Sequence, residues 1–168
     1  MSEADFGDFL ARSIMDFAED KVRAGSWDPN EAVANSRQVH EKLLSHGLST
    51  PNQHLYMIEL DGHSVGNLWL ALEQRSTEAA WFIYDVFVEQ SFRRRGIGFE
   101  ALTLLEKGAS QTGIRTIGLH VFGYNAAARK LYEKLGYEVT DINRRKISDK
   151  QRNSQVCCLP MSWNRDVG

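Results

Sequence analysis

The sequence predicts an α/β or α+β fold in which helices cover the faces of a central sheet. Four segments repeat apolar residues at the spacing of amphipathic helices, and runs rich in aromatic and β-branched residues fall between them. The most apolar run, AWFIYDVFV at 80–88, has the composition of a strand buried on both faces. The expected order is helix, helix, strand, strand, strand, helix, strand, helix, strand.

Length and composition fit one globular domain. The chain has 168 residues, of which 42% are hydrophobic and 25% charged, and its net charge of -2 argues against a nucleic-acid-binding protein. No apolar run reaches the roughly 18 residues of a membrane span, and the acidic N-terminus does not resemble a signal peptide. The adjacent cysteines Cys157 and Cys158 suggest neither a disulfide nor a metal site. We therefore expect a cytoplasmic protein without a metal, with one domain over 1–147 and a polar tail over 148–168.

The first two helices have recognisable ends. Asp5 stands three residues after Ser2, as in a capping box, and Gly25 is placed to end the first helix. The second helix is expected to begin at DPNEA, with Asp28 as its N-cap, and to end at Gly47. The residues expected to face the core from these helices are Phe6, Leu10, Ile14, Phe17, Val39, Leu43 and Leu44.

A hairpin is expected next. Asp61-Gly62 lies between two apolar runs, and these residue types accept the positive φ angles that a type I′ turn needs. This predicts antiparallel strands over 54–60 and 63–72, ahead of the strand over 80–88. Two later strands are expected at RTIGLHV (115–121) and YEVTD (137–141).

Two further helices complete the expected fold. The third follows the arginine-glycine turn at 93–98 and ends at Gly113, and the fourth extends from Asn125 to its cap at Gly136. The residues expected to face the core from the third helix are Ile97, Ala101, either Leu104 or Leu105, and Ala109.

The turn QSFRRRGIGFE places Arg93, Arg94 and Arg95 before Gly96 and Gly98, at the start of a helix. A helix N-terminus has free amide N–H groups and a partial positive charge, so it binds anions. Glycine lets a phosphate approach the backbone, and arginine adds forked donors. The turn lacks the nucleotide P-loop pattern, and Ala101 stands where a dinucleotide-binding loop needs its third glycine. A phosphate cradle and a solvated basic turn both fit these residues.

A second group of residues follows at LHVFGYNAAARKLYEKLGYE (119–138). Asn125 opens the fourth helix, and Tyr132 lies seven residues later, on the same helix face. Helical spacing alone leaves Tyr132 as either a core aromatic or a functional residue.

Together the two groups resemble the GNAT N-acetyltransferases. The resemblance rests on Arg93-x-x-Gly96-x-Gly98, on Leu119-x-Val121-x-x-x-Asn125, and on Leu131-Tyr132-x-x-x-Gly136-Tyr137, and it extends from about His54 to Asp141. The leading helices are similar to those of small bacterial acetyltransferases of this superfamily. Chains of the family usually begin with a strand, whereas here a helix starts at once, so that strand is absent or lies upstream.

The resemblance implies a GNAT-like mixed sheet with helices on both faces and splayed fourth and fifth family strands, the fourth being 80–88 here. Acetyl-CoA would lie in the splay as the acetyl donor. The residues expected to bind it are Phe87 and Val88 (pantetheine and acetyl group), Arg93, Arg94, Arg95, Gly96, Ile97 and Gly98 (pyrophosphate), and Asn125 (cofactor arm). Tyr132 would protonate the departing thiolate. Candidates for the general base are Asp85, Tyr84 and His120, and a proton could also leave through water.

The expected function is transfer of an acetyl group to a primary amine, on a small molecule or a peptide N-terminus, by direct attack in a ternary complex. The alternative is a non-catalytic module that binds acyl-CoA. Five acidic residues on the first helix favour a cationic acceptor or form a solvated face. The stretch 156–161 could cover a sheet edge in the same chain or in a homodimer partner.

Overall fold

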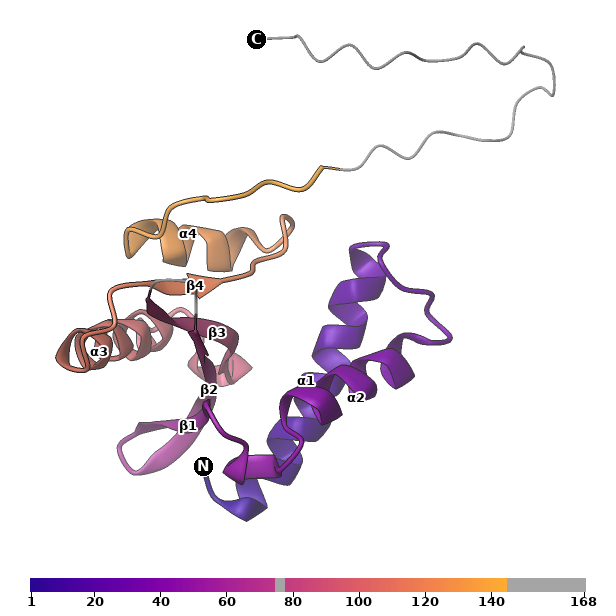
Figure 1. The fold of residues 1–168 in the computed structure, drawn as a ribbon, viewed down its shortest axis with the longest axis horizontal. Helices are drawn as coiled ribbons and strands as arrows, with labels where there is room; N and C mark the ends of the chain where they lie inside the picture. The colour runs from indigo at the N-terminus through magenta and orange to yellow at the C-terminus, as the bar shows by residue number, and fades with distance from the viewer. Residues whose placement is uncertain (75–77, 145–168) are drawn as a thin grey trace, which may run out of the picture. The chain divides into compact units, whose positions relative to one another are not determined.

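The structure is a computed structural model that describes residues 1–74 and 78–144. The chain divides into one unit, Met1–Tyr137, and a second, Glu138–Gly168. Every helix and strand of the described residues lies in the first unit (Figure 1). In the second unit, residues 138–144 are described and have no regular secondary structure.

The elements of the first unit follow the expected order up to the fourth long helix. The bounds are α1 Glu3–Arg23, α2 Ala32–Leu43, η1 Gly47–Ser49, β1 Gln53–Leu60, β2 His63–Gln74, β3 Ala79–Val88, η2 Gln90–Phe92, α3 Ile97–Gln111, β4 Ile117–Leu119 and α4 Ala126–Lys134. The strands form one mixed sheet in the order β1-β2-β3-β4, in which only β3 and β4 run parallel.

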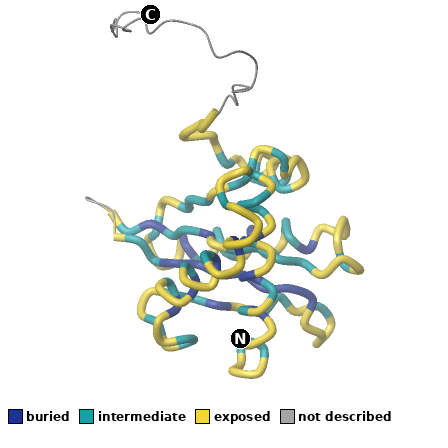
Figure 2. Tube along the Cα trace, turned by 90° about the vertical axis from the view of Figure 1, so that its right-hand side faces the viewer, coloured by how far each residue is buried: buried dark blue, intermediate teal, exposed yellow. Residues whose placement is uncertain are grey.

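Helices pack on both faces of this sheet, as predicted. Leu68, Trp69 and Leu70 follow one another on β2, so their side chains alternate between the faces. Trp69 joins a cluster with Phe9 of α1, whereas Leu68 and Leu70 join residues of β3 and α3. The buried members of the two clusters are Phe9, Leu44, Leu55 and Trp69 on one face, and Leu68, Leu70, Ile83 and Leu102 on the other. Figure 2 shows these buried segments in dark blue along the inside of the unit.

Three of the predicted local signals are confirmed, whereas the second helix ends at Leu43 and not at Gly47. Ser2 and Asp5 form the capping box of α1. Asp61 and Gly62 both have positive φ angles, 51° and 78°, as the hairpin turn requires. Gly113 also has a positive φ angle directly after α3.

One further prediction about the helices is wrong and another is incomplete. The second helix begins at Ala32 and not at Asp28, because the Asp28 carboxylate accepts a hydrogen bond from the Asn30 amide (2.8 Å) and thereby caps a separate turn. In α3 the side chain of Leu104 is 68% exposed, while Leu102 is fully buried and Leu105 packs against the second cluster. Of the alternatives Leu104 and Leu105, Leu105 faces the core as predicted, but Leu102 was not expected there. The contact with the sheet is therefore centred on Leu102, which places Leu104 on the outer side of the helix.

The prediction of a strand at 137–141 is also wrong. Residues 138–141 have no regular structure, and Val139 is exposed. A strand needs a hydrogen-bonded neighbour, and this stretch contains little apolar surface that could hold it against the sheet. The strand expected over 115–121 is reduced to Ile117–Leu119.

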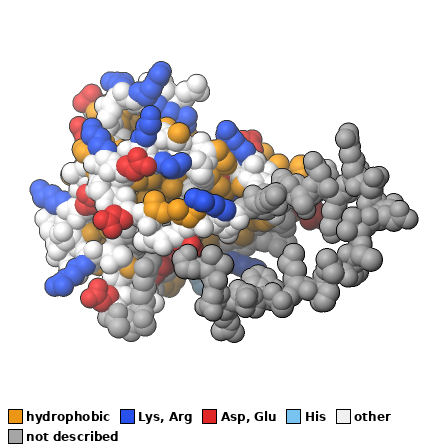
Figure 3. All heavy atoms as spheres, turned by 90° about the horizontal axis from the view of Figure 1, so that it is seen from above, with side chains coloured by type: hydrophobic (Ala, Val, Ile, Leu, Met, Phe, Trp, Pro, Cys, Tyr) orange, Lys and Arg blue, Asp and Glu red, His pale blue; other side chains and the backbone are white. Residues whose placement is uncertain are grey.

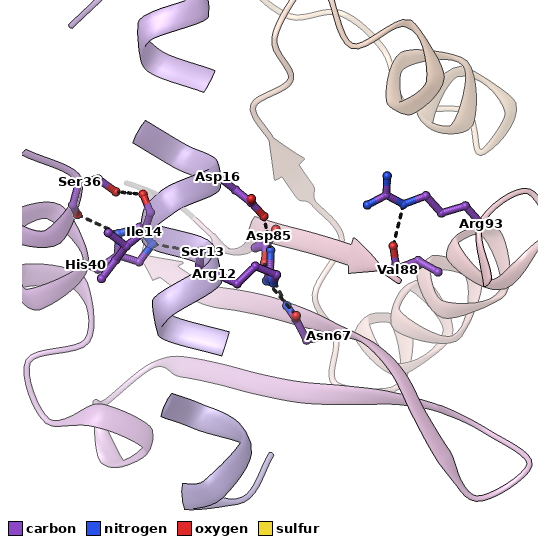
Figure 4. Close-up of polar contacts among 10 residues, drawn as sticks. All are labelled: Arg12, Ser13, Ile14, Asp16, Ser36, His40, Asn67, Asp85, Val88 and Arg93. Atoms are coloured by element: carbon purple, nitrogen blue, oxygen red, sulfur yellow. Dashed lines mark hydrogen bonds and ion pairs between the residues drawn. The ribbon is translucent and has the colours of Figure 1, made fainter. Parts of the chain in front are cut away.

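A buried polar chain joins α1 to α2, and the sequence pattern did not reveal it. The Ser13 Oγ lies 2.9 Å from His40 Nε2, the His40 Nδ1 lies 2.9 Å from the Ser36 carbonyl oxygen, and the Ser36 hydroxyl donates to the Ile14 carbonyl (2.7 Å). A carbonyl can only accept, so Nδ1 carries the proton and Nε2 accepts from Ser13. Burial lowers the pKa of His40 and favours this neutral form. Figure 4 shows how these contacts fix one helix against the other.

Candidate active site

The sheet opens along the second half of β3. Pairing between β3 and β4 stops at Ile83 and Leu119, whereas β3 continues to Val88. In the register with β2, Trp69 pairs with Asp85 and Leu70 pairs with Ile83, so Tyr84 is an extra residue in a bulge. A bulge bends its strand and increases its twist. Because the bulge lies where pairing with β4 ends, the two strands splay apart, as predicted.

We call residues 84–88 of β3 the open edge. Residues 85–88 keep their partners on β2, and β4 does not pair with any residue of the open edge. The strand expected to be buried on both faces is in fact only half covered there, and Tyr84 is 37% exposed. An extended segment of a ligand can therefore add to this edge through backbone hydrogen bonds.

Gly66 allows β2 to approach the open edge. A Cβ atom on Gly66 would lie 2.2 Å from the Phe87 carbonyl oxygen and 3.1 Å from the Val88 Cα. Both neighbours are backbone atoms of a paired strand, so they cannot rotate away. A larger residue at position 66 would push β3 out of its register.

Gly66→Ala should therefore lower the free energy of unfolding by about 1–3 kcal/mol, the usual cost of overpacking. Gly108→Ala is a matched control, since a Cβ there meets nothing within 4 Å inside α3, and alanine should raise stability by up to about 1 kcal/mol. Chemical denaturation measures both changes. Equal stability of Gly66→Ala and the unchanged protein would contradict the close approach.

The arginine-glycine turn forms a cradle, which we define as residues 93–98. Gly96 is the N-cap of α3 with a φ angle of 86°, and a Cβ there would meet nothing within 4 Å. The space over the first turn of α3 is therefore open to a ligand. Arg93 donates from Nε to the Val88 carbonyl oxygen (2.8 Å), which ties the cradle to the end of the open edge (Figure 4).

The other cradle residues differ in orientation. Arg94 has a positive φ angle of 60°, and the side chains of Arg93, Arg94 and Arg95 are all exposed. Ile97 is buried. A Cβ on Gly98 would lie 3.5 Å from Leu131 and 4.0 Å from Val88, so Gly98 faces α4 and β3.

A charged cluster lies behind the open edge, on the α1 face. Arg12 donates from Nη2 to Asp85 (2.6 Å) and to Asn67 (2.9 Å), and from Nη1 to Asp16 (2.7 Å). Asn67 donates to the same Asp85 oxygen (3.0 Å). The Arg12 guanidinium also lies 3.9 Å from the centre of the Phe87 ring. We call these four residues, Arg12, Asp16, Asn67 and Asp85, the Arg12 cluster (Figure 4).

The helix α4 places two predicted residues near the splay. Asn125 is its N-cap and accepts from the Ala128 amide (3.1 Å), which leaves the Asn125 side-chain NH₂ available to a ligand. Tyr132 packs against the second cluster, and its ring centre lies 5.6 Å from that of Tyr137. Burial, and after it the charge of Asp85, raise the pKa of the Tyr132 hydroxyl. The hydroxyl thus keeps its proton and can act as an acid.

The model of the acetyltransferase (GNAT) family matches residues 10–137, which include the open edge, the cradle and α4. The chain belongs to the GNAT family. The uncharacterised N-acetyltransferase YycN of Bacillus subtilis is 39% identical over 143 residues, covering 84% of this chain and 92% of YycN. The crystal structure of YycN covers 88% of this chain and 95% of its own, with a TM-score of 0.84.

Two further members have names that state an acceptor. The [ribosomal protein bS18]-alanine N-acetyltransferase of Escherichia coli is 30% identical over 82 residues, which cover 48% of this chain and 55% of that enzyme. The aminoglycoside N-acetyltransferase AAC(6')-Iy, solved in complex with CoA, is 20% identical and shares the fold, with a TM-score of 0.50 over 71% of this chain and 88% of its own. GNAT enzymes use acetyl-CoA as the acetyl donor, so this GNAT protein is an acetyltransferase.

The three base candidates of this GNAT chain lie in different surroundings. His120 is exposed and its ring contacts Phe122. Tyr84 stacks on Trp69 with ring centres 4.8 Å apart, and burial, followed by the charge of Glu73, raises its pKa. Asp85 lies on the open edge with one carboxylate oxygen already accepting two hydrogen bonds.

Apart from Asp85, the residues of the Arg12 cluster were not among the candidates that the sequence indicated. Arg12 and Asp16 look like a solvated ion pair on an amphipathic helix, and Asn67 looks like a polar break in a strand. Asn67 and Asp85 lie 55 and 73 residues after Arg12, and no local spacing indicates these contacts.

The predicted tail over 148–168 and the stretch 156–161 lie outside the described residues.

A second contact of α1 reaches the loop before α4. The Tyr124 hydroxyl donates to the Asp20 carboxylate, and the Arg23 guanidinium lies 4.0 Å from the centre of the Tyr124 ring. Arg12 of α1 contacts β3, and Asp20 of α1 contacts the loop that follows β4. The helix α1 therefore contacts both sides of the splay.

No helix among residues 1–74 and 78–144 has the length and hydrophobicity to cross a membrane. The face in Figure 3 shows basic and acidic side chains interspersed around hydrophobic ones.

Proposed function

We propose that this GNAT protein transfers the acetyl group of acetyl-CoA to a primary amine by direct attack in a ternary complex. The observation that supports it best is the adjacency of the open edge and the cradle, joined by the Arg93–Val88 hydrogen bond. This arrangement offers a strand edge to the amide-containing arm of CoA and a helix N-terminus to its pyrophosphate.

The binding contacts follow from chemistry. The pantetheine amides would pair with the backbone of Phe87 and Val88, and the amides of residues 94–98 would donate to the phosphate oxygens. The exposed arginines would add positive charge, since a guanidinium binds phosphate through paired donors. Asn125 would donate its side-chain NH₂ to a carbonyl of the cofactor arm.

The transfer step needs one group that gives a proton to the thiolate and one that accepts a proton from the amine. The amine nitrogen attacks the thioester carbonyl carbon, a C–N bond forms, and the C–S bond breaks. Tyr132 gives its proton to the departing thiolate, and the excess proton of the amine leaves through water or Asp85. A backbone N–H of the open edge would stabilise the oxyanion.

A primary amine is the acceptor class that the chemistry favours. The names of two relatives give an alanine of a ribosomal protein and aminoglycosides as acceptors, and both classes present an amine. The acidic side of α1, with Asp16 and Asp20, lies over the splay and suits a cationic acceptor.

The test is thiol release from acetyl-CoA in the presence of a library of small amines and of peptides with free N-termini. At least one amine should raise the rate above hydrolysis, with the acetylated amine found by mass spectrometry. Calorimetry with CoA provides the second measurement. CoA binding without acetyl transfer to any amine would instead support a non-catalytic acyl-CoA-binding module.

A further inference from the structure

Arg12 connects three parts of the candidate active site. Its two terminal nitrogens contact different carboxylates, Nη1 that of Asp16 on its own helix and Nη2 that of Asp85 on β3. Nη2 also reaches Asn67 on β2, and the guanidinium plane lies over Phe87 at 3.9 Å from the ring centre. One side chain thus fixes residues from α1, β2 and β3.

The contact with Asp85 differs from an ordinary surface ion pair. Both side chains are only 22% exposed, whereas the Asp16 side chain is 53% exposed. Asn67 is buried and donates to the same Asp85 oxygen. Two donors on one oxygen hold the carboxylate in a single orientation. A half-buried ion pair of this geometry is costly to break from one side.

The position of the cluster matters for transfer chemistry. Asp85 follows the bulge residue Tyr84, and Phe87 is one of the two residues that we expect along the acetyl end of the donor. Asn67 pairs with Phe87 across the sheet. The groups that Arg12 holds are therefore those that an acceptor meets as it approaches the open edge from the α1 face.

We propose that Arg12 is a positioning residue for acetyl transfer, which holds the Asp85 carboxylate and the Phe87 ring in the orientation that the acceptor requires. This inference rests on the proposed function. It assigns a role in turnover to a side chain of α1 that lies outside the cradle and outside the predicted donor contacts.

The test compares four variants by their kinetics with the best acceptor of the amine screen. Arg12→Met should lower kcat/KM for the acceptor on the order of 10–100-fold, because a small displacement of positioned groups is costly. The Kd for CoA should change less than about twofold. Arg12→Lys should recover part of the loss, because it restores the charge without the forked contact. The exposed α2 variants Glu41→Gln and Arg37→Met are controls that leave the Arg12–Asp85 contact intact and should match the unchanged protein.

A double-mutant cycle separates positioning from a general loss of stability. Arg12→Met and Asp85→Asn should give a combined loss close to that of either change alone, since both disrupt one unit. Arg12→Met with unchanged kinetics, or losses that multiply in the double variant, would overturn the proposal. If the unchanged protein acetylates no amine, the proposed function fails instead. The cycle is then measured on acetyl-CoA hydrolysis at the same site, where the same coupling is expected and an additive result again overturns it.

Discussion

Glutamate in place of Gly96 should abolish the binding of acetyl-CoA while the protein stays folded. Nothing lies within 4 Å of a Cβ at this position, so the side chain fits without a clash. Its carboxylate would stand at the N-terminus of α3, where the partial positive charge holds it in place of a phosphate. The added negative charge also repels the pyrophosphate. Calorimetric titration with CoA measures the loss.

Two control variants separate charge from backbone strain. Gly96 has a φ angle of 86°, so any L-residue there is strained by about 1–2 kcal/mol, and Gly96→Ala reports that strain alone. Gly113→Glu introduces the same residue at a φ angle of 79°, at the opposite end of α3. Gly113→Glu should bind CoA with nearly unchanged affinity, and Gly96→Ala should weaken binding far less than Gly96→Glu, because its methyl group adds no charge. If folded Gly96→Glu bound CoA with unchanged affinity, the cradle would not be part of the donor site.

Phenylalanine in place of Tyr132 should lower kcat on the order of 10²–10⁴-fold, the usual contribution of a positioned acid. A thiolate is a tolerable leaving group and water can replace the acid, so we expect a loss near the lower end. The ring and its packing remain, so folding and acetyl-CoA KM should persist. Tyr137→Phe removes a neighbouring hydroxyl in the same cluster and should leave kcat nearly unchanged. Thiol release at saturating acetyl-CoA gives both numbers.

The pH dependence of kcat adds a second check on Tyr132. Burial and Asp85 raise its pKa above the usual value of about 10, so the proton is kept as the pH rises and is lost only beyond that value. Initial rates should therefore show no decline between pH 7 and 10 that depends on Tyr132. A decline in that range that vanishes in the phenylalanine variant would contradict the raised pKa. If Tyr132→Phe and the unchanged protein had equal kcat, Tyr132 would have a packing role only.

Features that depend on neighbouring residues could be predicted from the sequence. The capping box at Ser2 and the turn at Asp61-Gly62 each need only a few adjacent positions. The family resemblance is also local, because its motifs lie within two strand-loop-helix segments. The resemblance predicted the splay, the cradle and the candidate acid Tyr132.

Features that depend on distant partners could not be predicted. Ser13, His40 and Arg12 look solvent-exposed when only their own helix is considered, although Ser13 pairs with buried His40 and Arg12 pairs with Asp85 of β3. The limits of β4 depend likewise on the bulge in β3, which no residue pattern in β4 itself encodes. Leu102 was missed for the same reason, since the sheet decides which side of α3 faces inward.

The hydrogen bond between Tyr124 and Asp20 spans 104 residues. The ribosome makes α1 before it makes α2, β3 and the loop before α4, so the contacts of α1 with these segments form one after another. The Ser13–His40 contact spans 27 residues, the Arg12–Asp85 contact 73, and the Tyr124 contact comes last. Closing a longer loop costs more chain entropy, and contacts of larger separation form more slowly. The two sides of the splay are therefore joined only after Tyr124 has been made, when β3 already stands as an uncovered strand edge. During that interval the nascent chain depends on its short hairpin and its early helices to keep this edge from pairing with another chain.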